Sequence, residues 1–169
     1  RVVATRRLPP ATEARLAERF DTVLSRDDHA MSPEELQAAL GDADGVICIG
    51  GDRFGADVLA MSPRRARIIC NYAVGTDNLD LAAAAAHGIV ITNTPDVPTD
   101  CTADLAMALI LGTLRRIGEG ERELRGGRWT GVRPTHLLSA KVTGRTLGIV
   151  GLGRIDRAVA RRAHFGFNM

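Results

Sequence analysis

Short apolar runs alternate with helical segments along the first 93 positions of the chain. Strands are predicted at 1–4, 45–49, 67–70 and 89–92. Helices are predicted at 12–20, from 32 to about 40, at 55–61 and at 79–87. Continuous apolar strands separated by helices are typical of a parallel sheet covered on both faces, and about five strand–helix units fit this stretch. The pattern therefore predicts an α/β fold.

The helix that begins after Ser32 carries the clearest local signals. Ser32 can cap the helix, Pro33 suits its first turn, and Glu35 can reach back in a capping box. We expect Gly41 to end this helix, and Gly88 to end the alanine-rich helix at 79–87.

The pattern changes at a turn-rich linker, residues 93–98. A long helix is predicted at 99–117, with Leu105, Ala108, Leu109 and Gly112 able to pack on one side. A second helical piece at 119–125 stops at a glycine pair. A strand is predicted at 146–150 and a helix at 154–164.

Composition narrows the class of protein. The 169 residues are 45% apolar and 25% charged, as in a globular domain, and the net charge of +2 gives no case for a nucleic-acid partner. No apolar run approaches the roughly 20 residues needed to cross a bilayer, so no membrane partner is expected. The cysteines fit no zinc spacing and no disulfide framework, which favours the cytoplasm and predicts no metal site; they are Cys48, Cys70 and Cys101.

A glycine-rich turn stands between the strand predicted at 146–150 and the helix that follows, where a dinucleotide-binding fingerprint belongs. Gly151 would make the tight turn, and Gly153 would let the backbone approach a pyrophosphate. The N–H groups of Arg154 and Ile155 would then point at phosphate oxygens. The third fingerprint position should be glycine but is Asp156, so a plain strand-to-helix turn stays open as an alternative.

Four stretches in order resemble the D-isomer-specific 2-hydroxyacid dehydrogenase family, and within it the glyoxylate/hydroxypyruvate reductase branch. They are residues 70–80, 88–98, 99–111 and 146–162. The resemblance implies a flavodoxin-like parallel-sheet substrate domain at 1–95, lacking its C-terminal helix. It implies that 96–169 hold the interdomain helix, the dimerisation arm and the first β-α unit of an incomplete Rossmann-type NAD(P)-binding domain.

The family chemistry implied is reduction of a 2-keto acid such as glyoxylate or hydroxypyruvate by NADH or NADPH, or the reverse. By resemblance, the N–H groups of Val74 and Gly75 hold the substrate carboxylate, and a glycine at 75 lets successive N–H groups converge on an anion. Thr102 matches the threonine that faces the nicotinamide. The alternative for the loop is a turn before a helix, capped by Asp77 or Asn78. We expect the loop and the glycine turn to serve one hydride-transfer site.

The resemblance also implies a homodimer through the arm at 99–135. Trp129 matches an arm tryptophan, whereas Val132 replaces a second one. The family's catalytic arginine, acidic residue and histidine would all lie beyond Met169, so no catalytic residue is assigned within the chain and the chain alone is expected to be inactive. None of its four histidines is assigned such a role; they are His29, His87, His136 and His164.

Several alternatives remain open at this stage. By the resemblance, the acidic residue that distinguishes NAD from NADP would lie beyond Met169, so either cofactor fits. Within the family, phosphoglycerate or formate could replace glyoxylate as substrate. Asp156 and the early stop favour a non-enzymatic remnant that binds small carboxylates or dimerises. We expect Asp156→Gly, made in the full-length protein, to tighten cofactor binding.

Overall fold

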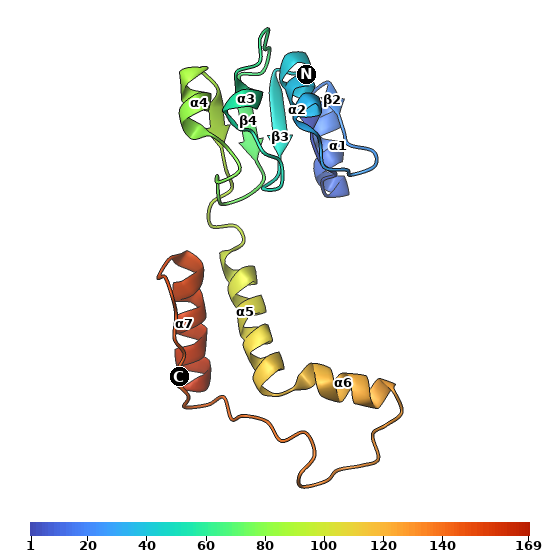
Figure 1. Ribbon diagram of the computed structural model, residues 1–169, viewed down its shortest axis with the longest axis vertical. Helices are drawn as coiled ribbons and strands as arrows, with labels where there is room; N and C mark the ends of the chain where they lie inside the picture. Colours follow the sequence, from blue (N-terminus) through green and yellow to red (C-terminus); the bar gives the residue numbers. More distant parts are fainter. The chain divides into compact units, whose positions relative to one another are not determined.

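The computed structural model describes residues 1–169, which form two compact units, Arg1–Pro95 and Asp96–Met169 (Figure 1). The first unit combines a sheet with helices, and the second is helical. None of the helices has both the length and the apolar character that a membrane span requires.

A five-stranded parallel sheet organises the first unit. Its strands are β1 (Val2–Ala4), β2 (Thr22–Val23), β3 (Gly45–Cys48), β4 (Ile68–Asn71) and β5 (Val90–Thr92). They lie in the order β2-β1-β3-β4-β5, and every neighbouring pair is parallel. This is the flavodoxin-like strand order, so the predicted fold is confirmed. The pattern missed β2, because two residues are too few to show a period.

Four helices connect these strands: α1 (Pro10–Arg19), α2 (Pro33–Asp42), α3 (Ala56–Leu59) and α4 (Leu81–Ala86). The capping box of α2 forms as predicted, with the Glu35 N–H donating to Ser32 Oγ at 3.3 Å and the Ser32 N–H to Glu35 Oε2 at 2.7 Å. The prediction that Gly41 ends α2 is wrong. Gly41 is helical, and a Cβ there would lie 2.7 Å from Met61 Cε, so close packing accounts for this glycine.

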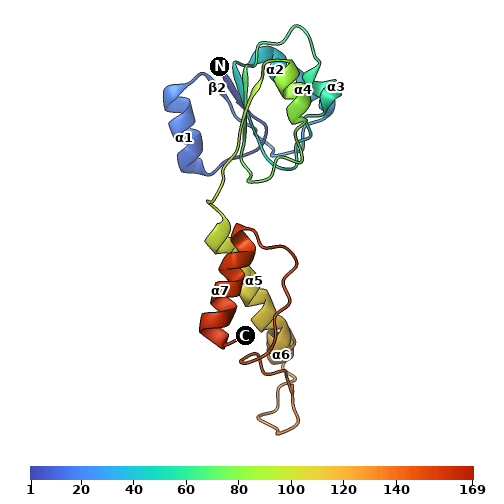
Figure 2. The same ribbon diagram turned by 90° about the vertical axis from the view of Figure 1, so that its left-hand side faces the viewer.

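The core of the first unit lies between the sheet and helices α2, α3 and α4, which cover one of its faces, while α1 lies on the other side (Figure 2). Val46 and Ile69 point into this core and are fully buried. Each such side chain contributes about 1.5–3 kcal/mol of burial free energy. Their strand neighbours Ile47 and Ile68 point to the opposite face and stay partly exposed.

The second unit consists of α5 (Thr99–Leu114), α6 (Ile117–Arg125) and α7 (Arg154–Phe167). Helices α5 and α7 lie side by side in both views (Figures 1 and 2). Two helices form here as predicted, but the boundary between them lies earlier than expected: α5 ends at Leu114 and α6 begins at Ile117, since Arg116 adopts a left-handed φ of 53°.

The face of α5 that packs differs from the one predicted. Ala103 and Met107 are buried against Ala158 and Ala163 of α7, whereas Leu105 and Leu109 are 60% and 62% exposed. Small residues on both helices allow the close approach. Arg162 of α7 reinforces it through hydrogen bonds to the carboxylates of Asp100 at 2.9 Å and Asp104 at 2.6 Å, which are residues of α5.

The strand predicted at 146–150 does not form. A β-strand is stabilised by hydrogen bonds to a neighbouring strand, and the second unit supplies none. Val150 is fully exposed in this segment. The strand prediction is therefore wrong for 146–150, because no pairing partner lies nearby.

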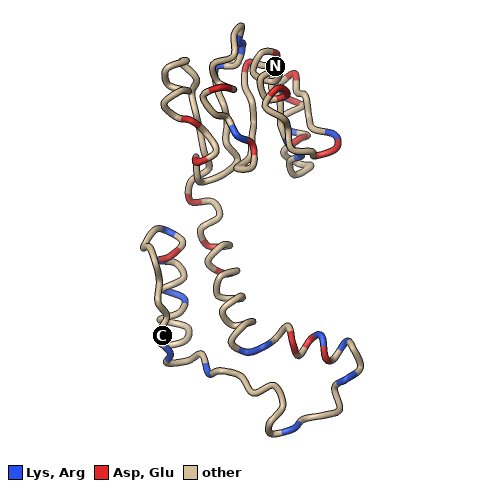
Figure 3. Tube along the Cα trace, in the orientation of Figure 1, with Lys and Arg blue, Asp and Glu red and all other residues tan.

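Charged residues of both signs are interspersed along α6, whereas the segment between α6 and α7 carries only Lys and Arg (Figure 3). Ion pairs join Arg116 to Glu119, and Arg125 to Glu121. Exposed pairs of this kind contribute little stability, about 0–1 kcal/mol each. The mixture along α6 is that of a solvated surface.

Candidate functional site

Loops that follow the strands of a parallel sheet share one edge, and ligands of α/β folds bind there. In the first unit this edge carries residues 72–78 after β4 and Asp52 after β3. A cavity of about 130 Å³ opens at the ends of β4 and β5, with Asn71 and Asn93 in its lining. This edge therefore has the position expected of a binding site.

Three consecutive carbonyls of the loop, those of residues 73–75, are held by the surrounding protein. Their donors are the Thr94 N–H at 2.9 Å, the Asn93 side-chain amide at 2.8 Å and the Asn71 side-chain amide at 2.8 Å. The N–H groups of Val74 and Gly75 are bonded to no other group of the chain. Two adjacent, unbonded N–H groups in an anchored loop can hold a carboxylate. We call this pair the carboxylate cradle.

Gly75 serves the carboxylate cradle differently from the way the sequence suggested. Its φ lies outside the left-handed region, so no glycine-only backbone conformation makes the N–H groups converge. Instead, a Cβ at this position would lie 2.8 Å from Asp77 Oδ1. Because the Asp77 carboxylate is so close, a bound anion needs a further cation to offset its charge.

The alternative role of the loop, a helix start capped by Asp77 or Asn78, does not hold. The cap of α4 is Asp80, whose Oδ1 accepts the Ala83 N–H at 2.9 Å. Asn78 is buried instead, and its side-chain amide donates to the carbonyls of Ile49 at 3.1 Å and Asp52 at 3.0 Å.

A network of buried polar side chains anchors the loop at residues 72–78. The Asn71 side-chain amide donates to Asn78 Oδ1 at 3.2 Å, within the loop after β4. Asn78 in turn connects this loop to Ile49 and Asp52 in the segment after β3. Asp52 is 2% exposed and accepts hydrogen bonds from Thr5 Oγ1 and the Ile49 N–H, while its Oδ1 has no partner. Sequence reasoning missed this network. Its only signal was the presence of polar residues at or shortly after the ends of the apolar strands.

The glycine turn lies in the second unit and keeps two backbone features of the fingerprint, although the strand that should precede it does not form. Gly151 has a φ of +95°, a conformation that side chains disfavour, and Gly153 is the N-cap of α7. The N–H groups of Arg154 and Ile155, in the first turn of α7, are bonded to no other group of the chain. The backbone therefore fits a pyrophosphate.

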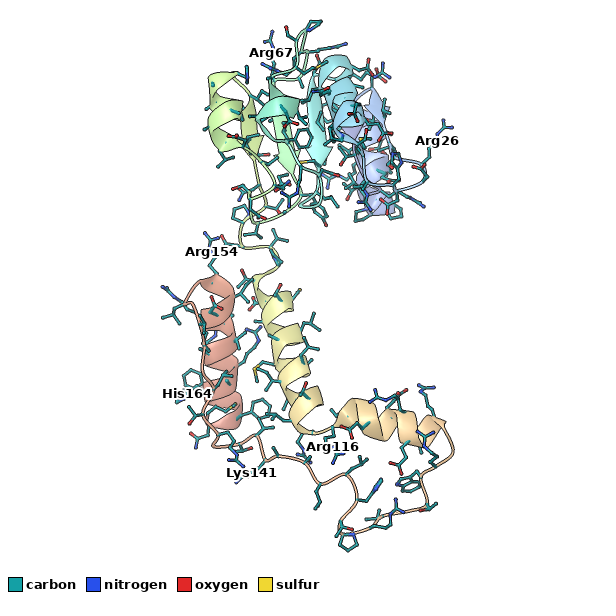
Figure 4. All side chains as sticks on the ribbon, in the orientation of Figure 1. Arg26, Arg67, Arg116, Lys141, Arg154 and His164 are labelled. Carbon is teal, nitrogen blue, oxygen red and sulfur yellow. The ribbon has the colours of Figure 1, made fainter.

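One side chain of the glycine turn does not fit an anionic ligand. Asp156 Oδ2 accepts the Gly153 N–H at 2.9 Å, so a carboxylate already occupies one donor of the turn. The guanidinium of Arg154, labelled in Figure 4, is paired with Asp96 at 2.8 Å.

Thr102 lies in the first turn of α5, where its N–H donates to the carbonyl of Pro98 at 2.9 Å. The Arg154–Asp96 ion pair holds the start of α7 near the start of α5. The structure thus brings Thr102 and the glycine turn to the same end of the second unit. The carboxylate cradle belongs to the first unit.

Two histidines have acidic partners but neither marks a catalytic site. His29 contacts Asp27 at 2.8 Å and Glu35 at 3.0 Å, after β2. Strand β2 is separated from β4 by β1 and β3, three strand spacings or about 14 Å. The other, His136, lies 3.1 Å from Glu123 in the arm of the second unit.

Comparison with known proteins identifies the family. Residues 2–164 match the sequence model described as the D-isomer specific 2-hydroxyacid dehydrogenase, catalytic domain. The chain belongs to this family. It is 43% identical over its whole length to a glyoxylate reductase of Thermococcus onnurineus, of which it covers 51%.

Two solved structures of family members resemble the chain. A Polaromonas protein described as an NAD-binding D-isomer specific 2-hydroxyacid dehydrogenase is 39% identical, with a TM-score of 0.90 over 99% of this chain and 52% of its own. An NADPH-dependent glyoxylate/hydroxypyruvate reductase of Sinorhizobium meliloti, in complex with NADP and malonate, is 38% identical, with a TM-score of 0.77 over 98% of this chain and 50% of its own. The chain spans about half the length of these relatives.

Proposed function

We propose that the chain is part of an oxidoreductase that acts on the CH–OH group of 2-hydroxy acids with NAD or NADP, reducing glyoxylate or hydroxypyruvate. One observation carries this proposal: three anchored carbonyls leave the N–H groups of Val74 and Gly75 unbonded at the ligand-binding edge of the sheet. Such a pair suits the carboxylate that every 2-keto acid carries.

The cofactor contacts that we propose come from the second unit. Gly151 and Gly153 let the backbone approach a pyrophosphate, and the N–H groups of Arg154 and Ile155 donate to it. Thr102 faces the nicotinamide, which supplies the hydride when bound. The solved relatives are described as NAD-binding or as holding NADP, which supports a nicotinamide cofactor of either kind.

We assign the arm at 99–135 to a homodimer contact. Trp129 is half exposed and lines an apolar cavity of about 310 Å³ with Leu124 and Leu137. Val132 in the same arm is 94% exposed. The proposed compartment is the cytoplasm, because all three cysteines are unpaired thiols.

The test is a spectrophotometric assay of NADH and NADPH oxidation with glyoxylate and hydroxypyruvate, on protein expressed from the complete gene. Turnover is expected with at least one of these substrates, and loss of turnover when Gly75→Val fills the cradle. Oxidation of phosphoglycerate or formate in place of these substrates would assign another activity within the family. The 169-residue chain alone is expected to show no turnover, since neither histidine of its first unit lies beside the cradle.

Asp156 favours a second candidate function, a non-enzymatic protein that binds small carboxylates or dimerises through its arm. The carboxylate on the Gly153 N–H opposes a bound pyrophosphate. Calorimetric titration with glyoxylate and sizing of the purified chain address this candidate. Glyoxylate binding or a dimer, without turnover by the protein from the complete gene, would favour it over the oxidoreductase.

A further inference from the structure

The carboxylate of Asp156 acts on the same atoms that a nucleotide would use. Its Oδ2 accepts the Gly153 N–H at 2.9 Å, and a Cβ at Gly153 would lie only 3.3 Å from that oxygen. The contact is local, between the N-cap of α7 and its third helical residue. A side-chain carboxylate at this point satisfies a free helical donor and complements the positive end of the helix dipole. It is therefore chemically equivalent to a bound anion.

We propose that Asp156 is an intramolecular competitor for the pyrophosphate of the cofactor and sets the cofactor affinity of this chain. The inference rests on the proposed function, because it presumes that the glycine turn is the cofactor site. A pyrophosphate that takes the Gly153 N–H must displace the carboxylate or share the donor with it. Sharing places two negative groups at hydrogen-bond distance from one donor, where they repel each other.

The rest of the turn does not oppose an anion. Gly151 keeps its φ of +95°, and the N–H groups of Arg154 and Ile155 have no acceptor in the chain. The nearby guanidinium of Arg154 is held by Asp96 at 2.8 Å, so it does not draw Asp156 away from the turn. Asp156 is thus the one side chain whose removal opens all three donors of the turn.

ADP is a suitable probe, because it carries the adenosine and pyrophosphate half of a dinucleotide. Its affinity for the 169-residue chain would be measured by calorimetry for the wild type, Asp156→Asn and Asp156→Gly. We expect Asp156→Gly to bind ADP about tenfold more tightly, which is the scale of a full charge at a helix start. Asp156→Asn, which keeps the acceptor and loses the charge, should fall between the two. The matched control for net charge is Glu121→Gln in α6.

A second readout separates competition from a merely structural role. Asp156→Gly removes a helix cap, so its melting temperature should fall while its ADP affinity rises. A structural residue would lower both. Equal ADP affinity in the wild type and Asp156→Gly, with the amide resonance of Gly153 shifting in both, would overturn the competition but leave the cofactor turn in place. No shift at residues 153–155 in any variant would overturn the proposed cofactor turn itself.

Discussion

The Asn71 side chain anchors the backbone of Gly75. Its Nδ2 donates to the Gly75 carbonyl at 2.8 Å, and the same nitrogen donates to Asn78 Oδ1 at 3.2 Å. Asn71 is 2% exposed at the end of β4. The carboxylate cradle thus depends on a side chain buried in the sheet rather than on the loop alone. This relationship gives the first of four predictions.

Asn71→Ala should lower both stability and ligand affinity. The substitution leaves the Asn78 side chain and the Gly75 carbonyl without a buried donor, at a cost of about 1–3 kcal/mol in the free energy of unfolding. Urea denaturation measures this loss, and calorimetry should show weaker glyoxylate binding. Asn93→Ala, which removes an exposed donor to the Val74 carbonyl, is the control and should cost less stability. Equal losses in the two variants would contradict the supporting role of the buried network.

Arg64 should be the most important arginine for the stability of the first unit. Its guanidinium donates to three backbone carbonyls. They belong to Leu59 at the end of α3, Ala66 before β4 and His87 after α4. Arg64→Ala is expected to cost about 2–4 kcal/mol, because three carbonyls lose a charged donor. Arg67→Ala, at the exposed arginine labelled in Figure 4, should change stability by less than about 0.5 kcal/mol. Thermal or urea unfolding of both variants measures the difference.

The His29 cluster should stabilise the protein in a limited pH window. The hydrogen bond to Asp27, and then the one to Glu35, raises the pKa of His29 above its ordinary value of 6.5. The stability that protonated His29 contributes is therefore complete below pH 6.5. It is lost as the pH rises through the higher pKa that His29 has in the folded state. The pKa values of Asp27 and Glu35 are lowered, chiefly by the His29 hydrogen bond and the Ser32 N–H respectively. Their contributions are present above their ordinary values of 3.8 and 4.5, and are lost as the pH falls.

Melting temperatures of the wild type and His29→Ala should accordingly differ most between about pH 4.5 and 6.5. The difference should shrink by pH 8.5. His87→Ala removes an exposed histidine that has no carboxylate partner and serves as the control. A difference between wild type and His29→Ala that stays constant from pH 5 to 8.5 would show that the cluster makes no pH-dependent contribution.

Cys48 should resist modification by thiol reagents in the folded protein, whereas Cys101 should react. Burial raises the pKa of the Cys48 thiol to about 12, whereas Cys101 is exposed in α5. Because the thiolate is the reacting species, Cys48 should be modified by a thiol reagent at pH 8 only after unfolding. Titration with a chromogenic disulfide, in the wild type and Cys101→Ser, measures the fast phase. A fast phase that persists undiminished in Cys101→Ser would refute the assignment.

Local signals in the sequence predicted most of the first unit. The apolar run at 45–49 formed a strand, and Ser32 and Glu35 formed their capping box, because both depend on neighbouring residues alone. The strand at 146–150 failed, because pairing depends on a distant partner. In α5, apolar residues lie on all sides, so periodicity could not distinguish Leu105 from Met107 as the buried one.

The candidate site was predicted only in its backbone. Val74 and Gly75 were expected from the family resemblance, and the glycines of the turn from a motif whose backbone requirements are local. The contacts that anchor or oppose ligands depend on side-chain placement. Asn71 reaches Gly75 across a loop, and no pattern in the sequence specifies that contact. Asp156 reaches back to the N-cap Gly153 as the third helical residue of a capping box does, a local signal that was not recognised.

The most direct test of the two backbone anion sites is an amide NMR titration of the 169-residue chain, with glyoxylate added to the wild type and ADP added to Asp156→Gly. Glyoxylate is predicted to shift the amides of Val74 and Gly75, and ADP those of residues 153–155. Shifts confined to other residues, or none with either ligand, would contradict the account.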